Sequence, residues 1–359
     1  MMTGRITLLL LFLLTATPGK LCAQKKGSGT YSIQTRTRKV TGSPLVWDTE
    51  KLFLLTGYGC FTEVRFKDVQ AFTKRSESRI VFSRSSFEKK LKSEFGVHYQ
   101  VSLTQDYLVV HPVGQDRFWP NRIQSVYTSF ENYFRGRRIP LGKHDYPLVA
   151  LVFATRAEFD EYSRKNGEKI DRNIVGYYSP NTNRIVMYDQ SQNGGTWTRN
   201  LDTVVHEISH QAAFNCGLHG RFADTPRWVV EGLGTMFEAP GVWDSLNHPQ
   251  QVERVNKGLL GLFREKTVSR NVKGWIGDVV VGNRLFEKDP EVSYSSSWAL
   301  SFYLMETQPR KYVDYMKMLE GLPPFKKYPA EKRVSDFSQA FGDFDRLEGL
   351  VRNFFTRFE

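Results

Sequence analysis

Cysteine is scarce in this chain of 359 residues, which contains only three. Cys22 lies in an apolar N-terminal segment, and the other two are Cys60 and Cys216. Two cysteines allow one disulfide at most, so a disulfide-dense fold and a zinc site made only of thiolates are both excluded. The spacing of Cys60 and Cys216 does not decide whether they pair with each other.

Several other signatures are also missing. The sequence contains no glycine-rich phosphate loop, no dinucleotide-binding fingerprint and no internal repeat. No apolar run approaches the roughly 20 residues of a membrane helix. The formal net charge is +12, but the basic residues are scattered in short clusters without a nucleic-acid-binding motif. We therefore expect no nucleic-acid partner and no stable membrane insertion.

The first 23 residues have the pattern of a signal peptide. Arg5 precedes an apolar run at 6–14, and Leu21-Cys22-Ala23 offers a cleavage site after Ala23. A lipid anchor on Cys22 is the alternative, which Leu21 disfavours because lipoprotein signals usually carry a small residue there. We expect a mature protein that is secreted or periplasmic.

Histidine is also rare, yet two of the seven stand four residues apart in His206-Glu207-Ile208-Ser209-His210. Apolar residues at helical spacing surround this segment, and Gly217 provides a stop. Positions i and i+4 of a helix share a face, so both imidazoles point the same way, with Glu207 about 100° round beside them. The spacing predicts a metal site of the type that zinc hydrolases use.

A second helix follows, with Thr225 as its expected N-cap and Pro226 at its first position. It carries Glu231 among apolar residues, where a buried acid needs a partner. Gly232 and Gly234 would allow this helix to pack closely on the first. Catalytic zinc takes three protein ligands and leaves a fourth position for water, so Glu231 would complete a set with the two histidines.

The histidine motif and the segment Trp228-Val229-Val230-Glu231-Gly232 together resemble the gluzincin branch of the zincin metallopeptidases. Residues 95–310 more closely resemble an uncharacterised family of secreted bacterial gluzincin-like proteins, through segments at 176–178, 183–184, 206–211, 226–228 and 231–233. The resemblance implies that zinc is the cofactor, that His206, His210 and Glu231 are its ligands, and that Glu207 is the catalytic base. It also implies an outer role for Glu238, supporting a ligand; a surface charge is the alternative.

One departure from the aminopeptidase-like gluzincins narrows the expected activity. Those enzymes hold the substrate amino terminus with a Gly-x-Met-Glu-Asn strand, and no such segment precedes the histidine helix here. The resemblance therefore favours an endopeptidase. It implies that Tyr294, well downstream of the glutamate helix, stabilises the tetrahedral intermediate; an ordinary residue at a helix start is the alternative. His219 is the second candidate, because it lies near the motif in the sequence.

The expected activity is zinc-dependent hydrolysis of peptide bonds in a protein or cell-envelope peptide, by a water that Glu207 activates. Two other functions are compatible with the sequence. One is a non-catalytic envelope-binding protein on a zincin scaffold, which the intact Glu207 argues against. The other is a zinc amidase acting on non-protein amides, which would use the same chemistry.

The expected fold class is α+β and zincin-like, with a mixed sheet and the histidine helix in an N-terminal lobe and a mainly helical C-terminal lobe. Residues 24–115 are strand-rich and form an accessory region or a prosegment, with strands at 79–83 and 99–113 around a helix at 87–95. Residues 116–245 form the catalytic lobe. Residues 246–359 form the helical lobe, where apolar residues at helical spacing recur.

A turn-rich segment at 179–183 joins two short strands, 175–178 and 184–188, in an expected hairpin. In the zincin fold, a strand just before the active-site helix forms the sheet edge along which an extended substrate lies. The resemblance implies this place for Arg184–Tyr188; an ordinary sheet strand is the alternative.

Overall fold

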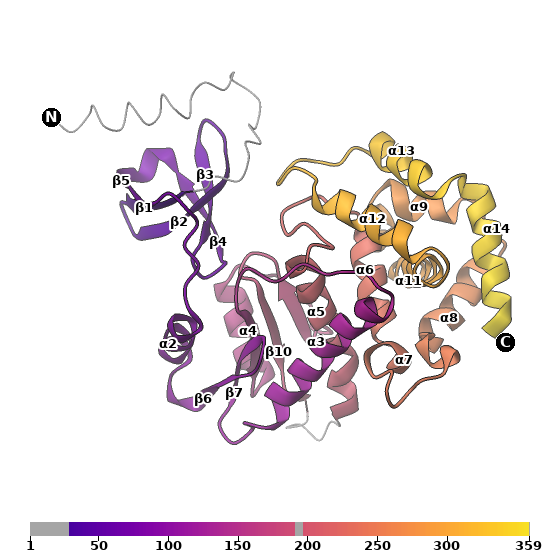
Figure 1. The fold of residues 1–359 in the computed structure, drawn as a ribbon, viewed down its shortest axis with the longest axis horizontal. Coiled ribbons are helices and arrows are strands. Elements are labelled where there is room, and N and C mark those ends of the chain that lie inside the picture. The colour runs from indigo at the N-terminus through magenta and orange to yellow at the C-terminus, as the bar shows by residue number, and fades with distance from the viewer. Residues whose placement is uncertain (1–28, 191–196, 359) are drawn as a thin grey trace.

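The computed structural model describes residues 29–190 and 197–358, with side chains at 29–190 and 201–358. Within these residues the protein has an α+β fold with two five-stranded sheets and a mostly helical C-terminal half (Figure 1). The predicted fold class is confirmed at this level. The predicted signal peptide, residues 1–23, lies outside the described residues. No helix in the described ranges is both long and apolar enough to cross a membrane.

The first sheet is antiparallel throughout, with strand order β4-β3-β2-β1-β5. Its strands are β1 (Thr30–Thr35), β2 (Lys39–Trp47), β3 (Lys51–Thr56), β4 (Phe61–Arg65) and β5 (Val69–Ser76). Alternate side chains bury a small core of its own, which includes Ile33, Leu52 and Leu54. This sheet stands apart from the larger body of the protein in Figure 1.

The second sheet is mixed, with strand order β6-β7-β8-β10-β9. Its strands are β6 (Tyr99–Leu103), β7 (Tyr107–Pro112), β8 (Leu148–Phe153), β9 (Gly176–Ser179) and β10 (Arg184–Tyr188). The three inner strands are parallel, and each outer strand is antiparallel to its neighbour. Because β6 and β7 are hydrogen-bonded into this sheet, the division between the two sheets falls near residue 80 rather than at 115.

Two strand predictions need correction. Residues 79–83 form no strand, because Ile80 N–H donates to Thr30 Oγ1 and Phe82 N–H donates to the Gly57 carbonyl, so these donors are used in a connection. Arg184–Tyr188 is a strand of the predicted hairpin, but it is not the sheet edge, because β10 lies between β8 and β9. The edge strand on this side of the sheet is β9.

Helices cover both faces of the second sheet. One layer contains α3 (Phe118–Gly136) and α5 (Trp197–Asn215), and the other contains α2 (Arg84–Phe95) and α4 (Arg156–Lys165). Alternate residues of β8 face the two layers: Leu148, Ala150 and Val152 join the core of the α3 and α5 layer, and Val149, Leu151 and Phe153 join that of α2 and α4. A strand buried on both faces is typical of the centre of a parallel sheet. The histidine motif thus lies on a helix that packs against the second sheet.

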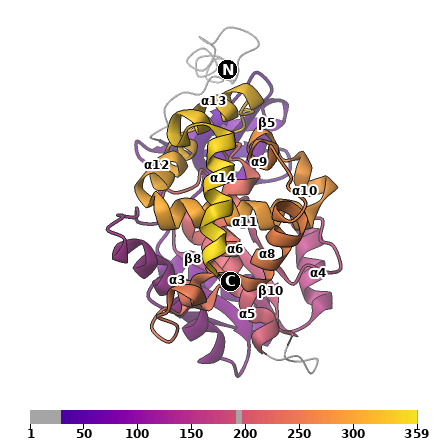
Figure 2. The same cartoon turned by 90° about the vertical axis from the view of Figure 1, so that its right-hand side faces the viewer.

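The C-terminal half is a bundle of helices around α11. The helices are α6 (Arg227–Phe237), α7 (Pro240–Trp243), α8 (Lys257–Phe263), α9 (Trp275–Val281), α10 (Arg284–Lys288), α11 (Pro290–Thr307), α12 (Pro309–Glu320), α13 (Ala330–Phe341) and α14 (Phe344–Phe355). α11 contacts α6, α8, α9, α12 and α14, and α14 crosses over it on the outer side (Figure 2). Trp298 and Phe302 on α11 are fully buried. This arrangement holds α6 between the bundle and α5.

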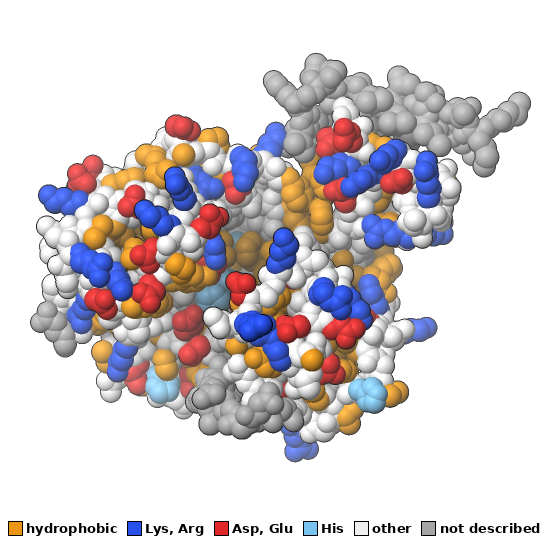
Figure 3. All heavy atoms as spheres, turned by 180° about the vertical axis from the view of Figure 1, so that it is seen from behind, with side chains coloured by type: hydrophobic (Ala, Val, Ile, Leu, Met, Phe, Trp, Pro, Cys, Tyr) orange, Lys and Arg blue, Asp and Glu red, His pale blue; other side chains and the backbone are white. Residues whose placement is uncertain are grey.

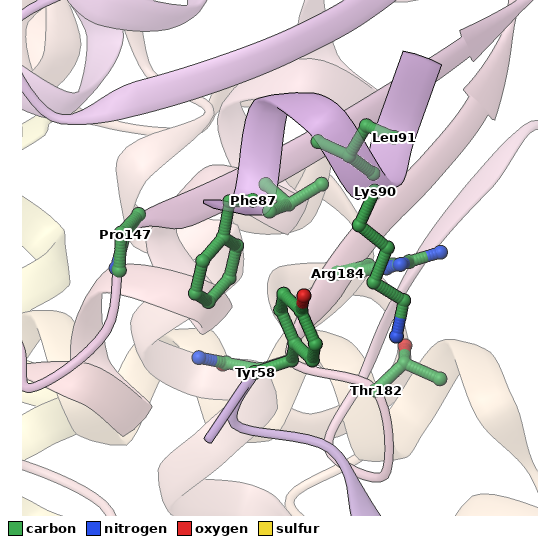
Figure 4. A pocket seen from close by; sticks show the side chains of 9 residues that line it. Tyr58, Phe87, Lys90, Leu91, Pro147, Thr182 and Arg184 are labelled. Atoms are coloured by element: carbon green, nitrogen blue, oxygen red, sulfur yellow. The ribbon is translucent and has the colours of Figure 1, made fainter. Parts of the chain in front are cut away.

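The turn between β3 and β4 attaches the first sheet to the second. Phe61 N–H donates to the Asn181 carbonyl in the β9–β10 turn, with an N···O distance of 2.6 Å. Nearby, Lys90 Nζ on α2 lies 4.1 Å from the ring centroid of Tyr58, and both side chains line a small cavity with Arg184 (Figure 4). The histidine motif contributes nothing to this cavity.

Candidate metal centre

α5 brings both histidines of the motif to one face. Its apolar residues, such as Val204 and Ile208, are fully buried in the core that this layer shares with the sheet. The helix ends at Asn215, shortly before Gly217 takes the left-handed conformation (φ 83°) that favours glycine at helix ends. His206 and His210 lie one turn apart, with ring centroids 4.4 Å from each other.

α6 begins one residue later than predicted, with Pro226 rather than Thr225 as its N-cap. The backbone N–H of Arg227 donates to Asn283 Oδ1 (3.1 Å), so a side chain distant in sequence supplies the capping acceptor. Thr225 Oγ1 is buried without a hydrogen-bond partner in the described residues. The helix nevertheless covers the predicted segment and places Glu231 opposite the histidines.

α6 and α5 approach each other closely at Gly234. A Cβ atom there would lie 2.8 Å from Cε1 of His206 and 2.9 Å from Cε1 of His210, which is closer than real Cβ contacts. Gly232 faces away from α5, because a Cβ atom there would meet Ser297 and Ser301 of α11. Of the two glycines predicted to permit this packing, only Gly234 serves the histidine helix; Gly232 serves the contact with α11.

His206, His210 and Glu231 form a group that could hold a metal ion, with one ligand atom from each residue and all three atoms within 4.8 Å of one another. Glu231 Oε2 lies 3.4 Å from His206 Nε2 and 3.7 Å from His210 Nε2. The three side chains are only 11 to 15% exposed. Figure 3 shows a hollow between the two halves of the protein, with a histidine side chain visible inside it.

The charge state of Glu231 suits a cation. Burial alone would raise the pKa of this carboxyl group, but its interactions with His206 and His210 outweigh burial and hold the pKa well below its usual value. Burial lowers the pKa of His206, but hydrogen bonds to Glu231 and Glu238 outweigh burial and hold this pKa well above its usual value. A cation would therefore meet an ionised carboxylate and displace a proton from His206, which gives the donor set of many catalytic zinc sites. The tight space above Gly234 leaves no room for a side chain between these donors.

Glu207 lies beside this group, as the helical spacing predicts. Its Oε2 accepts a hydrogen bond from the backbone N–H of Tyr178 on β9, with an N···O distance of 2.7 Å. Burial raises the pKa of Glu207, and the nearby histidines oppose this effect in part. A carboxyl group with a raised pKa, held in place by a backbone donor, is suited to accept and return a proton.

Glu238 contacts the ring nitrogen of His206 that does not face Glu231. Its Oε1 lies 2.8 Å from His206 Nδ1, and its Oε2 accepts a hydrogen bond from Asn256 Nδ2 (2.9 Å). A carboxylate at Nδ1 fixes the tautomer that leaves the lone pair on Nε2, the atom that faces Glu231. Of the two interpretations of Glu238, this geometry favours the supporting role over the surface charge.

Glu238→Ala is expected to weaken zinc binding by about 10- to 100-fold, because His206 would lose the partner that fixes its tautomer and ring orientation. Competition with a chromogenic chelator measures this affinity. Asp202→Asn is a matched control, since Asp202 is an exposed acid near Glu238 that makes no bond to either histidine. If both variants lost the same zinc affinity, the effect would come from the lost negative charge and not from the contact between Glu238 and His206.

Tyr294, on α11, also lies at the centre. Its hydroxyl oxygen is 3.2 Å from Arg227 Nη2. Burial raises the pKa of Tyr294, the charge of Glu231 adds to this rise, and Arg227 and His206 oppose it. Arg227 therefore links the Tyr294 hydroxyl to Glu231, because the same guanidinium contacts both side chains.

His219 does not have the geometry of an oxyanion donor. Its Nδ1 lies 2.9 Å from the Leu218 carbonyl, and because a carbonyl only accepts, Nδ1 carries the proton. Burial lowers the pKa of His219 to about 3, so Nε2 stays unprotonated and accepts rather than donates. Nε2 is buried without a partner among the described residues. Tyr294 is therefore the better of the two candidates.

Two residues of this centre were not foreseen from the sequence. Arg227 forms an ion pair with Glu231 (Nε to Oε1, 3.2 Å), a pairing that the spacing of four residues on one helix could have suggested. Asn256 is the N-cap residue of α8, and no sequence motif indicated that it belongs to this centre. Cys60 and Cys216 are both free thiols, so the disulfide that the sequence allowed is not formed.

Comparison with known proteins gives a partial match to one family model and no function. No curated protein matches the chain. Residues 200–326, about a third of the chain, match the model of a family described as "Protein of unknown function (DUF1570)". The matched segment contains His206, Glu207, His210, Glu231 and Tyr294, but not Tyr178, whose N–H donates to Glu207.

Proposed function

We propose that this protein is an exported zinc metallopeptidase of the gluzincin type that hydrolyses internal peptide bonds of a protein or a cell-envelope peptide. One observation carries the proposal: His206 Nε2, His210 Nε2 and Glu231 Oε2 converge within 4.8 Å, with the Glu207 carboxylate next to them. Catalytic zinc in hydrolases takes three such ligands and leaves one position open. The α+β architecture, with the motif helix on a mixed sheet, is compatible with a zincin fold.

The donor set favours zinc over harder cations. Two imidazole nitrogens suit zinc, whereas magnesium and calcium prefer sites made of oxygen alone. When bound, zinc would lower the pKa of a water molecule toward about 7 and polarise the substrate carbonyl.

The chain's own residues would carry the proton transfers. Glu207 would take a proton from the attacking water and deliver it to the leaving amine, while the Tyr178 N–H holds its carboxylate in place. The Tyr294 hydroxyl would donate to the oxyanion as it forms. Glu238 would keep His206 in the tautomer that its role requires.

A peptide in extended form would lie along β9. This strand ends the second sheet, and its outer edge has no strand partner within the described residues. The backbone N–H of Tyr178 already points from this edge toward the centre. Strand addition at an open edge uses main-chain hydrogen bonds and therefore accepts many sequences, which suits an endopeptidase.

The test is hydrolysis by purified residues 24–359 before and after removal of the metal. We expect internal cleavage of a mixed peptide library, detected by mass spectrometry, that disappears on chelation and returns with about one equivalent of zinc. Cleavage that chelation leaves unchanged would overturn the proposal. A protein that binds zinc tightly but cuts no peptide would point instead to an amidase or a binding scaffold.

A further inference from the structure

We propose that Arg227 is a positioning residue with two effects at this centre: it leaves Glu231 one oxygen for the metal, and it holds the Tyr294 hydroxyl at the same site. The first effect concerns metal binding alone. The second rests on the proposed function.

The two oxygens of Glu231 have different partners. Oε1 lies 3.2 Å from Arg227 Nε, one turn earlier on α6, whereas Oε2 faces Nε2 of His206 at 3.4 Å. A carboxylate that is free to rotate can bind a cation through both oxygens. With Oε1 held by the guanidinium, only Oε2 faces the two imidazoles, and the position that a second oxygen would take stays open for water or substrate.

The same guanidinium contacts Tyr294. Arg227 Nη2 donates to the Tyr294 hydroxyl oxygen at 3.2 Å, because a guanidinium has donors only. The tyrosine O–H is therefore left free to donate to another acceptor. A lysine could not make both contacts, since its ammonium is a single point on a flexible stem, while the planar fork of arginine presents Nε and Nη2 at fixed positions.

Neighbouring aromatic rings keep this arrangement in place. Arg227 Cζ lies 4.6 Å from the ring centroid of Phe286 on α10, and Phe286 meets the Tyr294 ring edge-on at a centroid distance of 5.4 Å. α6 and α11 are themselves closely packed at Gly232. Arg227 is thus fixed by contacts with three elements, unlike an ordinary surface pair on one helix.

Cobalt substitution tests the first effect without any substrate. Four-coordinate Co²⁺ absorbs visible light much more strongly than five- or six-coordinate Co²⁺. We expect the Co²⁺-loaded wild type to absorb strongly, Arg227→Gln to absorb weakly because Glu231 binds through both oxygens, and Arg227→Lys to fall between them. Chelator competition should show a loss of metal affinity of about 10-fold in Arg227→Gln.

Tyr294→Phe is the matched control, because it removes the tyrosine contact and keeps the Arg227–Glu231 pair. Its Co²⁺ spectrum should equal that of the wild type. With a cleavable peptide, Arg227→Gln and Tyr294→Phe should each lower kcat with little change in KM, and the double variant should lose less than the product of the two losses.

The possible failures are distinguishable. Arg227→Gln with the spectrum and metal affinity of the wild type would overturn the inference and leave the metal site standing. A wild type that binds neither Co²⁺ nor Zn²⁺ would overturn the metal centre itself, and the inference with it. A double variant whose loss of kcat equals the product of the two single losses would show that Arg227 does not act through Tyr294. Circular dichroism should be the same in the Arg227 variants and the wild type, because the Arg227 side chain is 40% exposed.

Discussion

Glu207→Gln is expected to lower kcat for peptide hydrolysis by about 10³-fold and to leave zinc affinity unchanged. The substitution is nearly isosteric. The glutamine Oε1 can still accept the Tyr178 N–H bond that Glu207 Oε2 accepts at 2.7 Å, so the side chain keeps its place. An amide oxygen cannot take a proton from water at neutral pH. The variant therefore loses proton transfer and keeps zinc binding.

The pH profile of the wild type gives an independent check. Burial raises the pKa of Glu207 above its ordinary value of 4.5, and the reaction needs the ionised form. Activity should therefore be full above this raised pKa and fall about tenfold for each pH unit below it. The part of the acidic limb that belongs to Glu207 should disappear in Glu207→Gln, because its small residual rate no longer depends on the ionisation of that carboxyl group.

The metal content of both proteins decides between explanations. Zinc-loaded Glu207→Gln that cuts as fast as the wild type would show that Glu207 is not the base. If both proteins hold zinc and neither cuts, the non-catalytic scaffold or the amidase would become the better proposal. A fold defect is ruled out when the two proteins have the same melting temperature and the same zinc affinity.

The two histidines of the candidate centre could be predicted because their signal is local. A spacing of four on one helix places His206 and His210 together whatever the rest of the chain does. The role of Glu231 needed one further assumption, that two successive helices pack face to face. Gly234 made this packing close enough, and its sequence position was a usable clue.

The pairing of strands that are distant in the sequence was not predicted correctly. The hairpin of β9 and β10 was recognisable, but which of its strands forms the sheet edge depends on which one pairs with β8, about 30 residues earlier. The same limit applies to residues 99–113, which were predicted as strand in the accessory region but form β6 and β7, two strands of the second sheet. Strand patterning fixes which side chains face a core, but not which strand lies alongside.

Gly234→Ala is expected to weaken zinc binding by more than about 100-fold, beyond the usual range for a change outside the ligand set. The added Cβ would sit 2.8 Å from His206 Cε1 and 2.9 Å from His210 Cε1, where ordinary contacts begin at 3.4 Å. α6 or both imidazoles must shift by several tenths of an ångström. Zinc–ligand distances tolerate only about 0.2 Å, so Glu231 and the histidines could no longer bind one ion together.

Two other glycines separate this effect from general destabilisation. Gly349→Ala, on α14 with no atom near the new Cβ, should stabilise the protein by about 0.5 to 1 kcal/mol and leave zinc binding unchanged. Gly232→Ala, which crowds Ser297 and Ser301, should mainly lower the melting temperature of the metal-free protein, with an overpacking cost of about 1 to 3 kcal/mol. Metal-free Gly234→Ala should melt closer to the wild type, because the clash involves two imidazoles at the partly open hollow rather than a closed core. If Gly234→Ala bound zinc like the wild type, the close approach of α6 to the two histidines would be wrong, and with it the shared metal group that supports the proposed activity.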